Sequence, residues 1–354
     1  MTPLRTSPAR ATGLLVGLLA AIACVSPAAG ASTSSAGIAY VTGGGAGLPS
    51  VSVADSSGGN ARKLGRGTGP LLSPNGLTVA ASDVGSSAHA LTLYPATGGT
   101  ATGYFTAATA ASAVAWSPDS RYLAVELTGE NAPSISGYGL AIIDTETGIE
   151  HVIANGVIYG ASFAPGTSDT LVYARAPSLS ATAATNIFTF AATGTATTQI
   201  TTDGRDADPV WGTRGIAFVH ERLRKRNAPL GQIWLMQPNG THRKQITHVQ
   251  VSLLAEGLVP LAFSADGTRL AAEFEGEDTS IGYSVSILTG HSTQLKVGDA
   301  AVSAWGISGS GHSVLISVGG FEQPPSKAKI ERIPFSGGHP TRLIAHGNYP
   351  SWNQ

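Results

Sequence analysis

A short sequence phrase recurs along this chain at a nearly constant interval, and it constrains the fold more than any other feature. Each copy begins with an aromatic or apolar residue, continues into a polar turn and leads into a short apolar segment. The copies begin at Leu72, Trp116, Phe163, Trp211, Phe263 and Ile307, with a partial copy at 351–353. Measured at the second residue of each copy, with Trp352 aligned to Gly212, the steps are 44, 47, 48, 52, 44 and 44 residues. The chain is therefore an array of similar units.

Each unit predicts short strands joined by tight turns. In one copy, residues 113–116 and 122–127 read as strands on either side of Ser117-Pro118-Asp119-Ser120, followed by strands at 140–144 and 150–153. Proline presets the first turn angle and aspartate tolerates the second. Four antiparallel strands repeating every 40 to 50 residues or so are typical of β-propeller blades, so the predicted class is all-β.

The two ends of the chain are incomplete in complementary ways. Residues 38–64 supply second, third and fourth strands without a first, whereas 349–353 form a first strand with nothing after it. We expect the C-terminal strand to pair with the N-terminal blade, which closes a seven-bladed ring and leaves no open sheet edge. A six-bladed ring is the alternative. The predicted organisation is a signal peptide at 1–31, a short N-terminus at 32–37 and one propeller domain at 38–354.

The first thirty residues predict export. Arg5 and Arg10 precede an uncharged apolar run at 14–25, which is too short to span a bilayer and is followed by the small residues 29–31. This pattern predicts cleavage after Ala31 and an extracellular or cell-envelope location. Cys24 is the only cysteine, which excludes an intramolecular disulfide. It lies in a lipoprotein-like box, so lipidation at Cys24 is the alternative to simple secretion and the one predicted route to a membrane.

The phrase and the strand after it, residues 116–125, resemble the WD-like repeat of TolB-type propellers, as do residues 232–247. The resemblance covers residues 38–352 and weakens at Gly166 and Ser310, which depart from the turn pattern. It implies a propeller that binds other proteins, and it brings no catalytic residues with it.

The connections between second and third strands are long and variable, and together they form what we call the loop face. Recognition usually resides in loops on a rigid scaffold. The basic residues of one such loop, Arg222, Arg224, Lys225 and Arg226, predict an anionic cell-wall polymer or acidic protein surface as partner; a merely solvated loop is the alternative. Nucleic acid is excluded, because the net charge is −1 and no aromatic residues interleave with the basic ones.

The mouth of the central channel is a second candidate ligand site. The residues just before each first strand are Arg66, Tyr159, Arg205, Asp206, Asp208, Glu256, Asp299, His346 and Tyr349. Carboxylates with arginine and tyrosine could bind a peptide or a sugar there. Alternatively, these residues only cap and orient the strands.

The sequence offers little for catalysis. The nine histidines are scattered, and His89, His220, His248 and His346 are the ones placed to reach the loop face, so we predict no metal and no cofactor. Ser308 aligns with a strand and turn rather than a nucleophile elbow, and the tryptophans are assigned to packing between blades. The favoured function is a non-catalytic binding or scaffolding module for a secreted or surface partner. A lyase or lactone hydrolase working at the channel mouth is the alternative.

Overall fold

The structure is a computed structural model that describes residues 35–43, 47–85, 88–106, 110–129, 137–166, 169–180, 183–221, 231–249, 255–276, 279–319 and 324–353. Ser34–Gln354 forms one compact unit, and its regular elements are β-strands. None of the described residues belongs to a helix long and apolar enough to span a bilayer.

The strands form antiparallel sheets that follow the order of the chain. The first sheet, in the order β3-β2-β1-β30, contains β1 (Ile38–Thr42), β2 (Ser50–Ala54), β3 (Arg62–Arg66) and β30 (Asn348–Trp352). The second contains β4 (Thr68–Leu72), β5 (Thr78–Ser82), β6 (His89–Pro95) and β7 (Thr102–Thr106). The third contains β8 (Ala110–Trp116), β9 (Tyr122–Thr128), β10 (Tyr138–Asp144) and β11 (Ile149–Asn155). The fourth contains β12 (Val157–Phe163), β13 (Thr170–Ala176), β14 (Asn186–Ala191) and β15 (Thr197–Gln199).

The C-terminal half continues this arrangement. A larger sheet contains β16 (Asp206–Gly212), β17 (Gly215–Glu221), β18 (Gly231–Met236), β19 (Lys244–Gln245), β20 (Ala255–Phe263), β21 (Arg269–Gly276), β22 (Thr279–Ser286) and β23 (Ser292–Gln294). A short pair, β24 (Lys296–Val297) and β25 (Ala300–Ala301), precedes a sheet of β26 (Ser303–Ile307), β27 (Ser313–Val318), β28 (Lys329–Pro334) and β29 (Thr341–Ile344).

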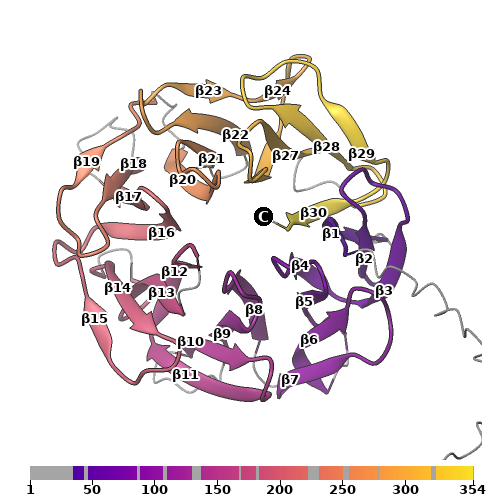
Figure 1. Ribbon diagram of the computed structural model, residues 1–354, viewed down its shortest axis with the longest axis horizontal. Coiled ribbons are helices and arrows are strands. Elements are labelled where there is room, and N and C mark those ends of the chain that lie inside the picture. Colours follow the sequence, from indigo (N-terminus) through magenta and orange to yellow (C-terminus); the bar gives the residue numbers. More distant parts are fainter. Residues whose placement is uncertain are drawn as a thin grey trace, which may run out of the picture. The chain divides into compact units, whose positions relative to one another are not determined.

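The groups of four strands lie around a common centre, each with its first strand innermost (Figure 1). The larger sheet consists of two such groups, β16–β19 and β20–β23, joined by the parallel pair Gly231–Gly257. Each group of four is a blade, and the fold is a β-propeller. β30 takes the innermost place beside β1, with Trp352 opposite Ile38. The predicted closure depends on this pairing; closure of the ring and the number of blades stay predictions.

The hydrophobic core lies between neighbouring blades. Leu91 of β6 packs with Leu123 and Val125 of β9, and Leu140 of β10 packs with Tyr173 of β13. All five side chains are fully buried. Burial of an apolar side chain of this size stabilises the fold by roughly 1.5 to 3 kcal/mol. Each blade is therefore stabilised by packing against its neighbours as well as by the hydrogen bonds between its own strands.

A small hydrogen-bond network explains why the phrase recurs. Ser117 Oγ donates to Asp119 Oδ1 (2.5 Å) and accepts from the Tyr122 backbone N (2.8 Å). In a second copy, Ser264 Oγ donates to Asp266 Oδ1 (2.6 Å) and accepts from Arg269 N (3.1 Å). The serine is buried in both copies, so its hydroxyl must find partners there. The network fixes the turn between the first and second strands.

The register of the innermost strands corrects the alignment of the last copy. Trp211 lies opposite Ile216 at the start of the second strand, and Trp352 lies opposite Ile38 in the same way. Trp352 therefore corresponds to Trp211 and not to Gly212, and the last interval, from Ile307, is 45 residues. A shared backbone feature supports this correction, because the residue three before each tryptophan has a positive φ.

Candidate functional site

Five residues predicted at the channel mouth lie on innermost strands: Tyr159 on β12, Asp206 and Asp208 on β16, Glu256 on β20 and Tyr349 on β30. The backbones of β12 and β16 approach closely, since a Cβ at Gly160 would lie 2.8 Å from Asp208 Cα. Burial raises the pKa of the Tyr159 hydroxyl, and the negative charges of Glu221, Asp208 and Glu126 raise it further. Carboxylates from neighbouring blades thus favour the neutral form of one tyrosine near the channel.

Asp208 and Tyr349 adopt backbone conformations that side chains rarely tolerate. Their φ angles are +48° and +51°, and the corresponding positions in two other blades are Gly69 (+55°) and Gly160 (+75°). A non-glycine residue in this region costs of order 1 to 3 kcal/mol. The Tyr349 ring packs edge-on against Trp305 at 5.6 Å, which helps to hold it in place.

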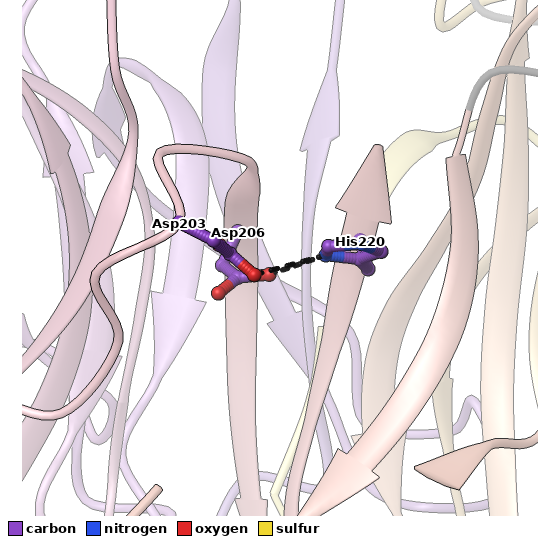
Figure 2. A group of neighbouring side chains, drawn as sticks. All are labelled: Asp203, Asp206 and His220. Carbon is purple, nitrogen blue, oxygen red and sulfur yellow. Dashed lines mark hydrogen bonds and ion pairs between the residues drawn. The ribbon is translucent and has the colours of Figure 1, made fainter. Parts of the chain in front are cut away.

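Asp206 also belongs to a cluster of charged side chains that was not predicted. It is the first residue of β16, lies directly opposite His220 of β17, and places Oδ1 2.7 Å from His220 Nδ1 (Figure 2). Asp203, in the connection before β16, places Oδ2 3.9 Å from the same nitrogen. Arg243, just before β19, donates from Nη1 to Asp203 Oδ2 (2.8 Å) and from Nη2 to Asp206 Oδ1 (2.5 Å). We call these four residues the Asp-His-Arg cluster.

The sequence could have supplied only part of this cluster. Asp206 is a predicted channel-mouth residue, whereas His220 was named only as a histidine placed to reach the loop face, with no metal predicted. The cross-strand pairing of β16 with β17 brings the two together. Asp203 and Arg243 were not predicted. Arg243 is 37 residues from Asp206 and reaches it from the turn just before the outermost strand β19, so no local pattern marks the contact.

Aromatic side chains pack against the Asp-His-Arg cluster, and its carboxyl groups are in charged and buried surroundings. The Arg243 guanidinium lies 5.0 Å from the Phe218 ring centre, and the His220 ring packs edge-on against Trp234 at 5.0 Å. Burial alone would raise the pKa of Asp203, but a hydrogen bond with Asp206 and the charges of Arg243 and His220 hold it below its ordinary value. Asp206 is fully buried, and its Oδ2 has no hydrogen-bond partner in the described part of the chain.

The remaining predicted site residues do not gather with these. The Arg205 carbonyl accepts from the Glu221 backbone N (2.9 Å), and the Arg205 backbone N donates to Asp203 Oδ1 (3.4 Å). Arg66 and Asp299 are exposed, and exposed His346 donates from Nδ1 to the Ser326 carbonyl (2.9 Å). The side chain of Glu256 and the basic residues Arg222, Arg224, Lys225 and Arg226 lie outside the described residues.

A cavity of about 500 Å³ lies where the innermost strands end and their short turns begin. This is the face opposite the loop face, because it carries the connections from first to second strands. The aromatic side chains that line it are Trp116, Phe163, Trp211, Phe263 and Trp352, and aliphatic neighbours are Leu71, Leu72, Val114, Val210 and Leu261. We call it the axial cavity. The tryptophans pack into the core as predicted, and Trp116, Trp211 and Trp352 also line this cavity, which was not predicted.

The axial cavity presents few polar groups. Its described hydroxyl-bearing residues are Ser162, Thr213 and Ser264, and none of its described lining residues is titratable. Ser162 Oγ accepts from Trp211 N (3.1 Å), and Thr213 Oγ1 donates to the Ala265 carbonyl (3.4 Å). The Trp116 indole donates to the Leu71 carbonyl (3.1 Å). These polar groups already serve contacts between blades.

Comparison with known proteins agrees with this architecture. No family model and no curated protein sequence matches the chain. Among solved structures, TolB from Acinetobacter baumannii is 13% identical with a TM-score of 0.53, over 89% of this chain and 82% of that one. The β-propeller domain of the trilobed protease from Pyrococcus furiosus is 11% identical with a TM-score of 0.63, over 89% and 96%.

The chain has a TolB-like β-propeller fold. This confirms the predicted all-β class of four-stranded antiparallel blades. An oligogalacturonate lyase in complex with manganese is also similar, with 14% identity and a TM-score of 0.56 over 77% of this chain and 80% of that one. Enzymes therefore share the fold with TolB, and at these identities the likeness shows the fold alone. The function of this TolB-like propeller must be argued from its own sites.

Proposed function

We propose that the protein is a non-catalytic binding module that receives an apolar segment of a partner protein in the axial cavity. The observation that carries this proposal is the lining of the cavity by aromatic and aliphatic side chains from many blades. Its volume of about 500 Å³ lies within the usual range of ligand pockets, roughly 300 to 1,000 Å³. The residues that line this cavity lie at equivalent positions in successive blades, so the cavity does not depend on the variable loops.

The chemistry of the lining favours binding over catalysis. General acid–base catalysis requires a titratable group within hydrogen-bond reach of the reacting atom. None of the described lining residues supplies one, and the hydroxyls of Ser162 and Thr213 are engaged in contacts between blades. A lyase or lactone hydrolase at this end of the channel finds no support among these residues.

The same lining indicates the chemistry of the partner. Trp and Phe rings offer a large apolar area, so they bind apolar or aromatic side chains most favourably. A charged polymer would lose its hydration in this cavity without gaining an ion partner, which is costly. An uncharged, apolar segment of a secreted or surface protein fits best. Encounter outside the cytoplasm is part of the proposal and rests on the leader-like sequence at 1–31.

A peptide selection with one designed variant tests this function. Full-length mature protein is used to select from a displayed library of random peptides, and the dissociation constant of each selected peptide is measured through tryptophan fluorescence. Gly309 lines the cavity, and a Cβ there would meet no heavy atom within 4 Å, so Gly309→Glu can introduce a charge without a backbone-adjacent clash. We expect selected peptides to be rich in apolar and aromatic residues and to bind about tenfold or more weakly to Gly309→Glu.

Gly47→Glu is the matched control. Gly47 also has no heavy atom within 4 Å of a built Cβ, but it lies in the connection between β1 and β2 on the loop face. Its variant should bind the selected peptides as the wild type does. Peptides that are mainly charged, or whose binding ignores Gly309→Glu, would refute the proposal.

A further inference from the structure

The Asp-His-Arg cluster points to a second site, independent of the axial cavity. We infer that Asp203, Asp206 and His220 form a binding site for a divalent transition-metal ion, zinc by preference, which replaces the guanidinium of Arg243. The ligand atoms offered by these three residues all lie within 4.8 Å of one another. They come from the connection after β15, from β16 and from β17 (Figure 2).

The distances are close to those that a zinc ion requires. Zinc binds carboxylate oxygen and imidazole nitrogen at about 2.0 to 2.2 Å, so tetrahedral ligand atoms are about 3.3 Å apart. His220 Nδ1 lies 2.7 Å from Asp206 Oδ1 and 3.9 Å from Asp203 Oδ2. Values on both sides of the ideal separation mean that small side-chain rotations suffice.

The scaffold holds these side chains in place. Asp206 and His220 are directly paired across β16 and β17, and the Asp206 backbone N donates to the Thr185 carbonyl (3.1 Å). Gly204 shapes the connection, with a φ of +75° and its N–H bonded to Asn186 Oδ1 (3.0 Å). The Oδ1 of Asp203 accepts from Arg205 N (3.4 Å), which leaves Oδ2 directed to the other ligands.

A buried, unsatisfied oxygen is the independent sign of a ligand. The Asp206 side chain is 0% exposed, and its Oδ2 finds no hydrogen-bond partner among the described residues. Buried carboxylate oxygens are normally hydrogen-bonded or metal-bound. An ion beside Oδ1 could also engage Oδ2, because carboxylates coordinate through one oxygen or both.

Charge explains why an ion can displace Arg243. Metal ligands bind in their deprotonated form, in which two carboxylates and a neutral imidazole carry −2. One guanidinium neutralises half of this charge, whereas a divalent ion neutralises all of it. Arg243 bonds to the same two oxygens that would bind the metal, so both cations cannot occupy the cluster together. The Arg243 side chain is 24% exposed and has a path to solvent. Mixed carboxylate and imidazole ligands favour zinc over magnesium or calcium.

The competition between Arg243 and metal gives a distinctive test. Full-length mature protein is stripped with a chelator, dialysed and titrated with zinc chloride by calorimetry, with magnesium chloride as a second titrant. We expect one zinc per chain and no comparable magnesium binding. Zinc should bind at least about tenfold more tightly to Arg243→Gln, because this variant removes the positive charge that competes for the ligand oxygens. Asp203→Asn should weaken binding about tenfold or more. Asp203 is 31% exposed, so this variant should fold.

Arg121→Gln is the matched control, since Arg121 pairs with the carboxylates of Asp144 and Glu146 elsewhere on the surface. It should leave zinc binding unchanged. Thermal melting of each variant without metal confirms folding, and cobalt substitution with visible spectroscopy reports the coordination geometry. A wild-type protein that takes up no stoichiometric zinc would overturn the inference. Zinc binding that Asp203→Asn leaves intact would overturn it too, as would equal strengthening by Arg121→Gln.

Discussion

At the scale of single residues, one carboxylate can fix a blade's first turn. Asp266 Oδ1 accepts from Ser264 Oγ (2.6 Å), Thr268 N (3.0 Å) and Thr268 Oγ1 (2.9 Å). These hydrogen bonds, that from Ser264 foremost, lower the pKa of Asp266 to about 2. The negative charge is therefore part of the turn.

This pKa predicts how stability depends on acid. An aspartate has a pKa of about 3.9 in an unfolded chain. Since the folded value is lower, the stabilisation is fully present above about pH 4 and is lost as the pH falls through about 2. Asp266→Asn keeps an acceptor oxygen but cannot titrate, so its unfolding free energy should fall less over this interval. Urea unfolding midpoints between about pH 5 and pH 2 measure this; identical slopes for the variant and the wild type would count against it.

The residue scale also shows the limit of sequence reasoning. Ser117-Pro118-Asp119 predicted a turn, because proline and aspartate have known turn preferences. The Asp-His-Arg cluster was not predicted, because it depends on which side chains meet across strands and no spacing in the sequence encodes the reach of Arg243.

At the scale of elements, departures from the phrase have packing causes. Gly212 stands where other blades have the buried serine, and a Cβ there would lie 2.5 Å from Phe263 Cδ2 in the next blade. The glycine makes room for an aromatic side chain of its neighbour. The departure from the repeat at Gly212 is therefore explained by close packing against the neighbouring blade.

The contact predicts coupling between two blades. Gly212→Ala should lower the unfolding free energy by about 1 to 3 kcal/mol, the usual range for overpacking. Phe263→Leu removes ring atoms and should recover part of that loss in the double variant. A double-mutant cycle from urea unfolding gives the coupling. Purely additive effects would mean that the two side chains do not compete for this space.

At the scale of the whole molecule, the first and last described strands share one blade. β30 pairs with β1, and Ser351 Oγ also accepts from the Leu72 backbone N (2.9 Å), which links β30 to β4. The repeat period and the incomplete end copies were enough to predict this arrangement. The period did not predict the axial cavity, because its lining depends on how far each innermost strand extends toward the centre.

Removal of the last strand tests closure. Deleting residues 349–354 takes away β30 from Tyr349 onward and leaves the edge of β1 unpaired, which invites association between chains. We expect a lower melting temperature and aggregation, measured by calorimetry and light scattering. A truncated chain that stays monomeric and melts at the wild-type temperature would contradict closure by this strand.

The axial cavity is the centre of this account, and hydrogen exchange on a peptide complex tests it most directly. Amide exchange is measured by mass spectrometry with and without a selected apolar peptide. We predict protection in the segments that line the cavity, including residues 71–74, 114–118 and 161–166, with no change at the loop-face connection 82–90. Protection confined to the loop face, with none in the cavity segments, would contradict the proposed function.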